Sequence, residues 1–251
     1  MKKHYGILAI LLILSMIVTT GCRPAGKSRR AIQREMKEYL EAEYNSPAHV
    51  KRPVLSGNTG FGYHSYSAEA YLKNDPDNKF YVSYHITDGR ITAGYHTVRL
   101  RQEGRKSMYE KLTKYYNPDD ILQMNFMIHY NSGLVRTEDM TYESLVEEHR
   151  GEYRIDLTFH IAKEHFNEEL ESEVIRRFLE DYSEKNNLEK IDLFIVYWNE
   201  AYKEEFHKTF KYNIPENPIE RGLRFADFYL VVRHTTDFDI NNISRYFNYE
   251  D

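Results

Sequence analysis

Apolar residues recur along the chain at two spacings, which are typical of amphipathic helices and of half-buried strands. From Ile32 to Tyr44 every fourth residue is apolar or aromatic, which predicts a helix over residues 29–44, with Ser28 as its N-cap. The strongest helical pattern follows Asn167, a predicted N-cap, and its apolar face comprises Leu170, Val174, Ile175, Phe178, Leu179 and Tyr182. Shorter helices are predicted at residues 141–148, around Tyr202, Phe206 and Phe210, and around Met108, Leu112 and Tyr115 before Asn117-Pro118.

Alternation of apolar and polar residues predicts the strands. Residues 66–72 and 80–86 both alternate, and the polar residues 74–78 between them predict the turn of an antiparallel hairpin. A third strand near residues 91–100 is expected to run into the following helix. Later strands are predicted at 121–130, 153–161 and 224–233, and residues 191–198, apolar on both faces, predict a central strand. In the strand at 121–130 we expect one apolar face, made of Leu122, Met124, Phe126, Ile128 and Tyr130.

Helices mixed with half-polar strands in this order predict an α+β fold. We expect a largely antiparallel sheet, or two such sheets, flanked by amphipathic helices. The similar segments Tyr39-Leu40-Glu41 and Phe178-Leu179-Glu180 each lie on an amphipathic helix before a sheet segment, which suggests two α+β modules divided near Asn117-Pro118. These modules are residues 29–118 and 119–251, and one continuous domain is the alternative.

The N-terminus has a different pattern. Met1-Lys2-Lys3-His4 forms a short basic region, and residues 5–18 carry no charge. This apolar run is shorter than the ~20 residues that a membrane-spanning helix needs. Residues 1–21 are therefore interpreted as a signal peptide.

The residues that end this segment, Val18-Thr19-Thr20-Gly21-Cys22, resemble the lipobox of bacterial lipoproteins, with Thr19 where leucine is usual. The resemblance implies that the thiol of Cys22 receives a diacylglycerol group and that the chain is cut just before it. It also implies a location at the outer, extracytoplasmic face of the cell membrane, with membrane lipid as the first partner. Cys22 is the only cysteine, and acylation gives that thiol a purpose outside the cytoplasm. Residues 22–28 then form a short polar tether.

Charge narrows the choice of partners. Without residues 1–21 the chain has 32 basic and 39 acidic side chains, a formal charge of −7, which disfavours nucleic acid as a ligand. The 22 tyrosines are a composition that fits half-buried sheet positions and also aromatic binding surfaces.

Known catalytic motifs do not occur in the chain. The segment Asp75-Pro76-Asp77-Asn78 fits a hairpin turn that needs no calcium ion. Residues 237–241 have the opening spacing of a calcium-binding loop but lack its glycine and its later glutamate. The acidic cluster Glu168, Glu169, Glu171 and Glu173 is interpreted as a solvated helix face. The sequence therefore predicts no cofactor.

Three histidines, His85, His129 and His160, fall opposite the apolar residues of their predicted strands. If the strands of His129 and His160 pair, these two side chains could come together and bind a metal ion or a substrate. The alternative is that each is a solvated polar residue without a common role.

Three classes of function remain. The first is a non-catalytic module that binds a small ligand or an envelope protein, which an anchored, aromatic-rich domain without catalytic motifs favours. The second is an envelope hydrolase acting on wall polymer or peptide, and the third is a structural role in an assembly. An enzyme should gather titratable side chains in one cleft, whereas an adaptor should expose an apolar patch.

Overall fold

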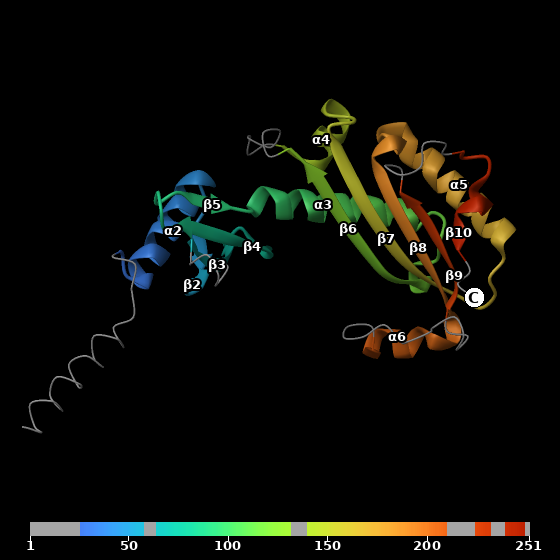
Figure 1. Cartoon of the computed structure of the whole chain (residues 1–251), viewed down its shortest axis with the longest axis horizontal. Helices are drawn as coiled ribbons and strands as arrows, with labels where there is room; N and C mark the ends of the chain where they lie inside the picture. The colour runs from blue at the N-terminus through green and yellow to red at the C-terminus, as the bar shows by residue number, and fades with distance from the viewer. Residues whose placement is uncertain (1–25, 58–63, 132–139, 210–223, 232–238, 249–251) are drawn as a thin grey trace, which may run out of the picture. The chain divides into compact units, whose positions relative to one another are not determined.

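The computed structural model describes residues 26–57, 64–131, 140–209, 224–231 and 239–248 (Figure 1). The chain forms two compact units, Met1–Tyr95 and His96–Asp251, so the boundary lies before the one expected near residue 118. The reason is that the helix before Asn117 packs into the core of the second unit, to which it contributes Leu100, Met108 and Leu112. Both units contain a largely antiparallel sheet, which confirms the α+β fold class.

The first unit combines helix α2 (Arg29–Glu43) with a five-stranded antiparallel sheet. Its strands are β1 (Ala48–Val50), β2 (Val54–Ser56), β3 (Ser65–Leu72), β4 (Asp75–His85) and β5 (Ile91–Ala93). They lie in the order β1-β3-β4-β5, and β2 also pairs with β3. Ser28 caps α2 by accepting a hydrogen bond from the backbone N–H of Ala31, as the sequence predicts. Its side chains Ile32, Met36 and Leu40 are buried.

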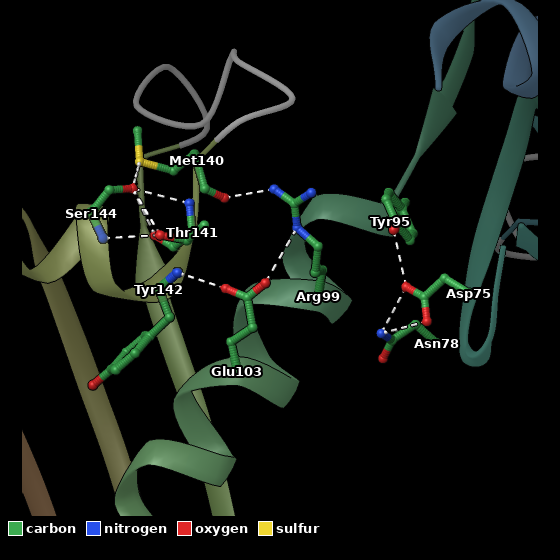
Figure 2. Close-up of polar contacts among 9 residues, drawn as sticks. All are labelled: Asp75, Asn78, Tyr95, Arg99, Glu103, Met140, Thr141, Tyr142 and Ser144. Carbon is green, nitrogen blue, oxygen red and sulfur yellow. Dashed lines mark hydrogen bonds and ion pairs between the residues drawn. The ribbon is translucent and has the colours of Figure 1, made fainter. Parts of the chain in front are cut away.

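The predicted hairpin of β3 and β4 is confirmed, but its turn is shorter than expected. Residues 75–78 belong to β4, because Asp75 already pairs with Leu72 of β3. The side-chain amide of Asn78 donates to the two carboxylate oxygens of Asp75 at 2.9 and 3.1 Å, and the hydroxyl of Tyr95 donates to the same carboxylate at 3.0 Å (Figure 2). The acidic residues of this segment are thus held by hydrogen bonds within the first unit.

The second unit contains a sheet in the order β10-β9-β8-β7-β6. These strands are β6 (Ile121–Tyr130), β7 (Tyr153–Lys163), β8 (Ile191–Asn199), β9 (Arg224–Val231) and β10 (Phe247–Asn248). The helices are α3 (Tyr95–Leu112), α4 (Tyr142–Glu148), α5 (Glu168–Lys185) and α6 (Lys203–Thr209). Short 3-10 helices are η1 (Pro118–Asp120), η2 (Leu188–Lys190), η3 (Glu200–Tyr202) and η5 (Ile243–Tyr246). β7 and β8 are parallel and are joined through α5, whereas the other neighbours are antiparallel.

The two faces of this sheet are covered differently. Helices α3, α4 and α5 contribute to one large core, together with the alternate residues of β6 to β9 that face them. On the opposite face, η3 and α6 cover one end of the strands (Figure 1) and form a smaller cluster around Trp198, Tyr202 and Phe206. The rest of that face carries polar side chains such as Asn125, His129 and Asp156, with Met127 exposed among them.

The start of α4 is fixed by hydrogen bonds from within the second unit. Thr141 and Ser144 form a capping box, in which the Thr141 hydroxyl accepts from the Ser144 backbone N–H. A carboxylate oxygen of Glu103 on α3 accepts from the Tyr142 N–H at 2.7 Å, and Arg99 donates to the carbonyl of Met140 at 2.7 Å (Figure 2). These contacts satisfy backbone groups that the helix itself leaves unpaired.

Three local expectations are wrong. The strand predicted at 91–100 is only Ile91–Ala93, because residues from Tyr95 onward continue the four-residue repeat of α3. Leu122 belongs to the smaller cluster, since the register shifts between Ile121 and Gln123 and turns its side chain to the other face. Leu170 is 65% exposed in the first turn of α5.

Helices long and apolar enough to cross a bilayer do not occur among the described residues. Cys22 and the residues before it lie outside the described residues, so the signal peptide and the lipid anchor remain predictions.

Candidate functional site

Four charged or titratable side chains gather on the polar face of the second sheet. They are His129 on β6, Arg154 and Asp156 on β7, and Asp192 on β8. Their neighbours in sequence, such as Ile128, Ile155 and Leu193, are buried in the core. Because side chains alternate along a strand, burial of one set directs the other set to the opposite face.

The strand register brings these side chains into direct contact. His129 pairs with Arg154 and Met127 pairs with Asp156 on the antiparallel ladder, so His129 and Asp156 are diagonal neighbours. On the parallel ladder Asp156 lies beside Asp192. His129 Nε2 lies 2.7 Å from Asp156 Oδ2, and Arg154 Nε donates to Asp156 Oδ1 at 3.0 Å. Arg154 Nε also lies 3.6 Å from Asp192 Oδ2.

Arg154 stabilises the ionised carboxylate of Asp156. Partial burial of Asp156 acts to raise its pKa, but the hydrogen bonds from Arg154 and then from His129 outweigh it. The pKa of Asp156 is therefore below its ordinary value, and the carboxylate is ionised at neutral pH. A charged carboxylate at Nε2 fixes the orientation of the His129 ring, whose side chain is 41% exposed.

A hollow of about 440 Å³ adjoins this group of side chains. The ends of β6, β7 and β8 form its walls, and Gly151, with a φ of +96°, makes the turn before β7. The acidic and basic residues that line it are His129, Glu152, Arg154, Glu189, Lys190 and Asp192. We refer to these six residues and the space between them as the β6–β8 hollow.

His160 is not part of this hollow, and the predicted pair of His129 and His160 does not form. The register pairs His160 with Gln123, near the opposite end of the ladder from His129 and Arg154. His160 is buried, and its Nδ1 accepts a hydrogen bond from Trp198 Nε1 at 3.0 Å. Burial, reinforced by the charge of Arg224, lowers the pKa of His160 to about 4. His160 is thus a neutral core residue.

His85 lies in the first unit, where its Nε2 is 3.3 Å from the hydroxyl of Thr92. Within the described ranges, His, Cys, Asp and Glu side chains do not gather in threes with the geometry to hold a metal ion. A metal site at His129 and His160 is therefore not supported, because the two side chains lie apart and no third ligand joins them among the described residues.

Glu171 is a residue whose environment the sequence reasoning missed. It was assigned to a solvated acidic face, yet its side chain is 6% exposed and lies 2.6 Å from Lys163 Nζ. The hydroxyl of Tyr116 donates to Glu171 at 3.1 Å and lies 3.0 Å from the hydroxyl of Tyr197. Burial, together with the nearby carboxylate, raises the pKa of both tyrosines well above the ordinary value.

The sequence does contain a pattern that indicates the burial of Glu171. Counting four, three and four residues onward from Glu171 gives Ile175, Phe178 and Tyr182, which are all buried on α5. Glu171 therefore lies on the core face of the helix. Because its carboxylate is already paired within the core, this group of residues stabilises the unit and offers no open site.

The sequence matches no protein-family model, and no curated protein matches it. Among solved structures, the chain is similar to a DUF5037 family protein from Ruminococcus gnavus, with 15% sequence identity and a TM-score of 0.41. The comparison covers 84% of this chain and 97% of that chain. The proposals below rest on the residues of this chain alone.

Proposed function

We propose that this protein is a lipid-anchored binding protein of the bacterial envelope, attached to the outer face of the cell membrane through Cys22. The lipobox-like segment supports the anchor. The observation that carries the binding role is the β6–β8 hollow. The strand pairing gathers His129, Arg154 and Asp192, and the segments just before β7 and β8 add Glu152, Glu189 and Lys190 around the same space. Its volume is within the range of about 300–1,000 Å³ typical of small-ligand sites.

The lowered pKa of Asp156 disfavours this carboxyl group as the general acid or base of a hydrolase. A general acid or base works best with a pKa near the working pH, which for a carboxyl group means a raised value. The pKa of Asp156 is lowered instead, and both of its oxygens accept hydrogen bonds, from His129 and from Arg154. A hydrolase acting on wall polymer or peptide is the alternative that the experiment below can detect.

The charges of the hollow indicate the class of ligand. Its lining has three carboxylates, Glu152, Glu189 and Asp192, and two cations, Arg154 and Lys190. The excess of one negative charge favours a short cationic peptide, either free or as an exposed segment of an envelope protein. Such a ligand can present an amine to the carboxylates and its own backbone carbonyls to Lys190.

The first test is calorimetry on the mature chain without lipid, residues 22–251 with Cys22→Ser. The probes are the amidated tripeptides Ala-Lys-Ala and Ala-Glu-Ala. We expect Ala-Lys-Ala to bind at least about tenfold more tightly, because the hollow attracts a cation and repels an anion. Glu152→Gln/Glu189→Gln should abolish this preference.

The matched control is Glu164→Gln/Glu204→Gln, which removes the same charge at exposed positions outside the hollow and should leave the preference intact. Equal affinity for both tripeptides, or an equal loss in the control, would refute the proposed ligand class. Cleavage of either tripeptide during the titration would replace the binding role with the hydrolase alternative.

The anchor has a separate test. Cells that express the full chain or its Cys22→Ser variant are labelled with a fatty-acid analogue. We expect label only in the full chain, because the thiol of Cys22 is the predicted attachment atom. Incorporation of label into the serine variant would show that the anchor assignment is wrong.

A further inference from the structure

The two units of the chain carry opposite net charges. Residues 22–95 contain 11 basic and 8 acidic side chains, a formal charge of +3, whereas residues 96–251 contain 21 basic and 31 acidic side chains, a charge of −10. The positive unit is the one that follows the predicted lipid attachment site. Net charge of one sign favours surfaces of the other sign.

Within the described residues of the first unit, one face of the sheet carries no helix. Helix α2 packs on the other face, against buried residues such as Phe80 and Val82. The residues next to these in β4, Lys79 and Tyr81, consequently project from the free face. Tyr81 is 69% exposed, the highest value of any large apolar side chain among the described residues.

Neighbouring strands add to this face. The register places Glu69 of β3 beside Tyr81, and Lys51 Nζ lies 2.6 Å from the Glu69 carboxylate. Val54 of β2 pairs with Ser67, two residues before Glu69, and is 59% exposed. We refer to Lys51, Val54, Glu69, Lys79 and Tyr81 as the basic sheet face.

The charges of this face are unequal. The hydrogen bond from Lys51 lowers the pKa of Glu69, and Lys79 adds a smaller contribution in the same direction. Two lysines therefore surround one carboxylate, which leaves an excess positive charge beside an exposed tyrosine and an exposed valine. Tyrosine is favoured at the level of lipid headgroups, and lysines near a bilayer surface are attracted to anionic lipids.

We propose that the basic sheet face of the first unit rests on anionic lipid headgroups of the membrane that holds the chain. Lys51 and Lys79 contact lipid phosphates, while Tyr81 and Val54 lie at the headgroup level. The expected closeness of this unit to the bilayer rests on the proposed anchor. The seven residues from Cys22 to Ser28 extend by at most ~3.3–3.6 Å per residue, so an anchored chain keeps this unit near the membrane surface. The lipid contact itself does not require the anchor.

The test uses the mature chain without lipid, so that its result is independent of acylation at Cys22. Binding is measured by co-sedimentation with vesicles of phosphatidylcholine alone and of phosphatidylcholine mixed with phosphatidylglycerol. We expect binding to the anionic vesicles only, and weaker binding at high salt. Lys51→Gln/Lys79→Gln should weaken it by about 25-fold, at roughly fivefold per lysine.

Two variants distinguish an effect of the basic sheet face on vesicle binding from an effect of the net charge of the chain. Arg105→Gln/Lys106→Gln removes the same charge from exposed positions on α3, within the second unit, and should bind as the parent does. Tyr81→Ser should weaken binding to the anionic vesicles while the circular dichroism spectrum stays unchanged. Each variant is also tested for folding by the same spectrum.

Several results would overturn the proposal. They are equal binding of the parent to both kinds of vesicle, no binding to either, and equal losses in the Lys51/Lys79 and Arg105/Lys106 variants. Self-association of the parent that Tyr81→Ser removes would assign the face to a second copy of the chain instead. Because Cys22 labelling is measured separately, failure of the lipid contact and failure of the anchor can be told apart.

Discussion

His160 and Glu171 are both buried titratable residues, and the second unit accommodates them in different ways. Glu171 is paired with Lys163 and hydrogen-bonded by Tyr116, so its partners compensate for burial. His160 has Trp198 as a hydrogen-bond donor and lies against the ring of Phe206. The positive charge of Arg224, which is paired with Asp227, also lowers the pKa of His160. A proton on His160 is therefore disfavoured.

The lowered pKa of His160 predicts how stability depends on pH. Its pKa falls from 6.5 in the unfolded chain to about 4 in the folded protein, so between these values the unfolded state binds more protons. The stabilising contribution is complete above about pH 6.5 and is lost as the pH falls toward 4. The expected loss is on the order of 3 kcal/mol. The lowered pKa of Asp156 contributes little to this pH range, because most of its effect on stability is lost below its ordinary value of 3.8.

Urea unfolding at pH 7 and at pH 4.5 measures this effect. The control is His160→Gln, which keeps an acceptor for the Trp198 N–H but cannot gain a charge. We expect a smaller difference between the two pH values in the variant. The same difference in parent and variant would mean that another group carries the pH dependence.

At the scale of elements, helix α3 approaches β6 and α4 closely at Gly104. A Cβ at this position would lie 2.4 Å from a ring carbon of Phe126 and 2.9 Å from a ring carbon of Tyr142. Both rings are buried and pack edge to face, with centroids 5.7 Å apart. The glycine is therefore required for the distance between the helix and the sheet, although it lies within a helix.

The Gly104→Ala substitution has two opposing effects on stability. Alanine favours the helix by about 1 kcal/mol, but overpacking of a core costs about 1–3 kcal/mol. We expect a net loss of about 1 kcal/mol in the free energy of unfolding, measured with urea. Ser107→Ala on the same helix, where a Cβ is already present, should change stability by no more than about 0.5 kcal/mol. A more stable Gly104→Ala variant would show that Phe126 and Tyr142 can move aside.

At the scale of the whole molecule, each unit has its own buried core. Leu40 is fully buried within the first unit, and Phe178 is buried within the second. Trp198, the only tryptophan, is buried in the second unit and reports on its unfolding. This arrangement allows the stability of the two units to be measured separately.

We expect the units to unfold in separate transitions. Leu40→Ala should destabilise the first unit by about 2–5 kcal/mol and leave the midpoint of the Trp198 fluorescence transition unchanged. Phe178→Ala should shift that fluorescence midpoint by a comparable free energy. If Leu40→Ala moves the fluorescence midpoint as much as Phe178→Ala does, the two units unfold as one.

The sequence by itself determined the elements with strong periodicity. The helices at 29–44 and after Asn167 were predicted with their caps, because Ser28 and Asn167 accept hydrogen bonds from backbone N–H groups only three residues away, and the helix at 141–148 was predicted without its cap. The hairpin of β3 and β4 and the central position of β8 were also predicted. These features depend on local hydrogen bonds and on which face of one element is apolar.

Only the tertiary structure decided which strands are neighbours and in what register. That register joins His129 to Asp156 and Arg154, separates His129 from His160, and buries Glu171 beside Lys163. A shift by one residue would exchange the two faces of a strand, and a single sequence does not specify that shift. The α+β class was therefore predictable from the sequence, whereas the β6–β8 hollow was not, because its residues come from three strands and from the segments before β7 and β8, which only long-range pairing brings together.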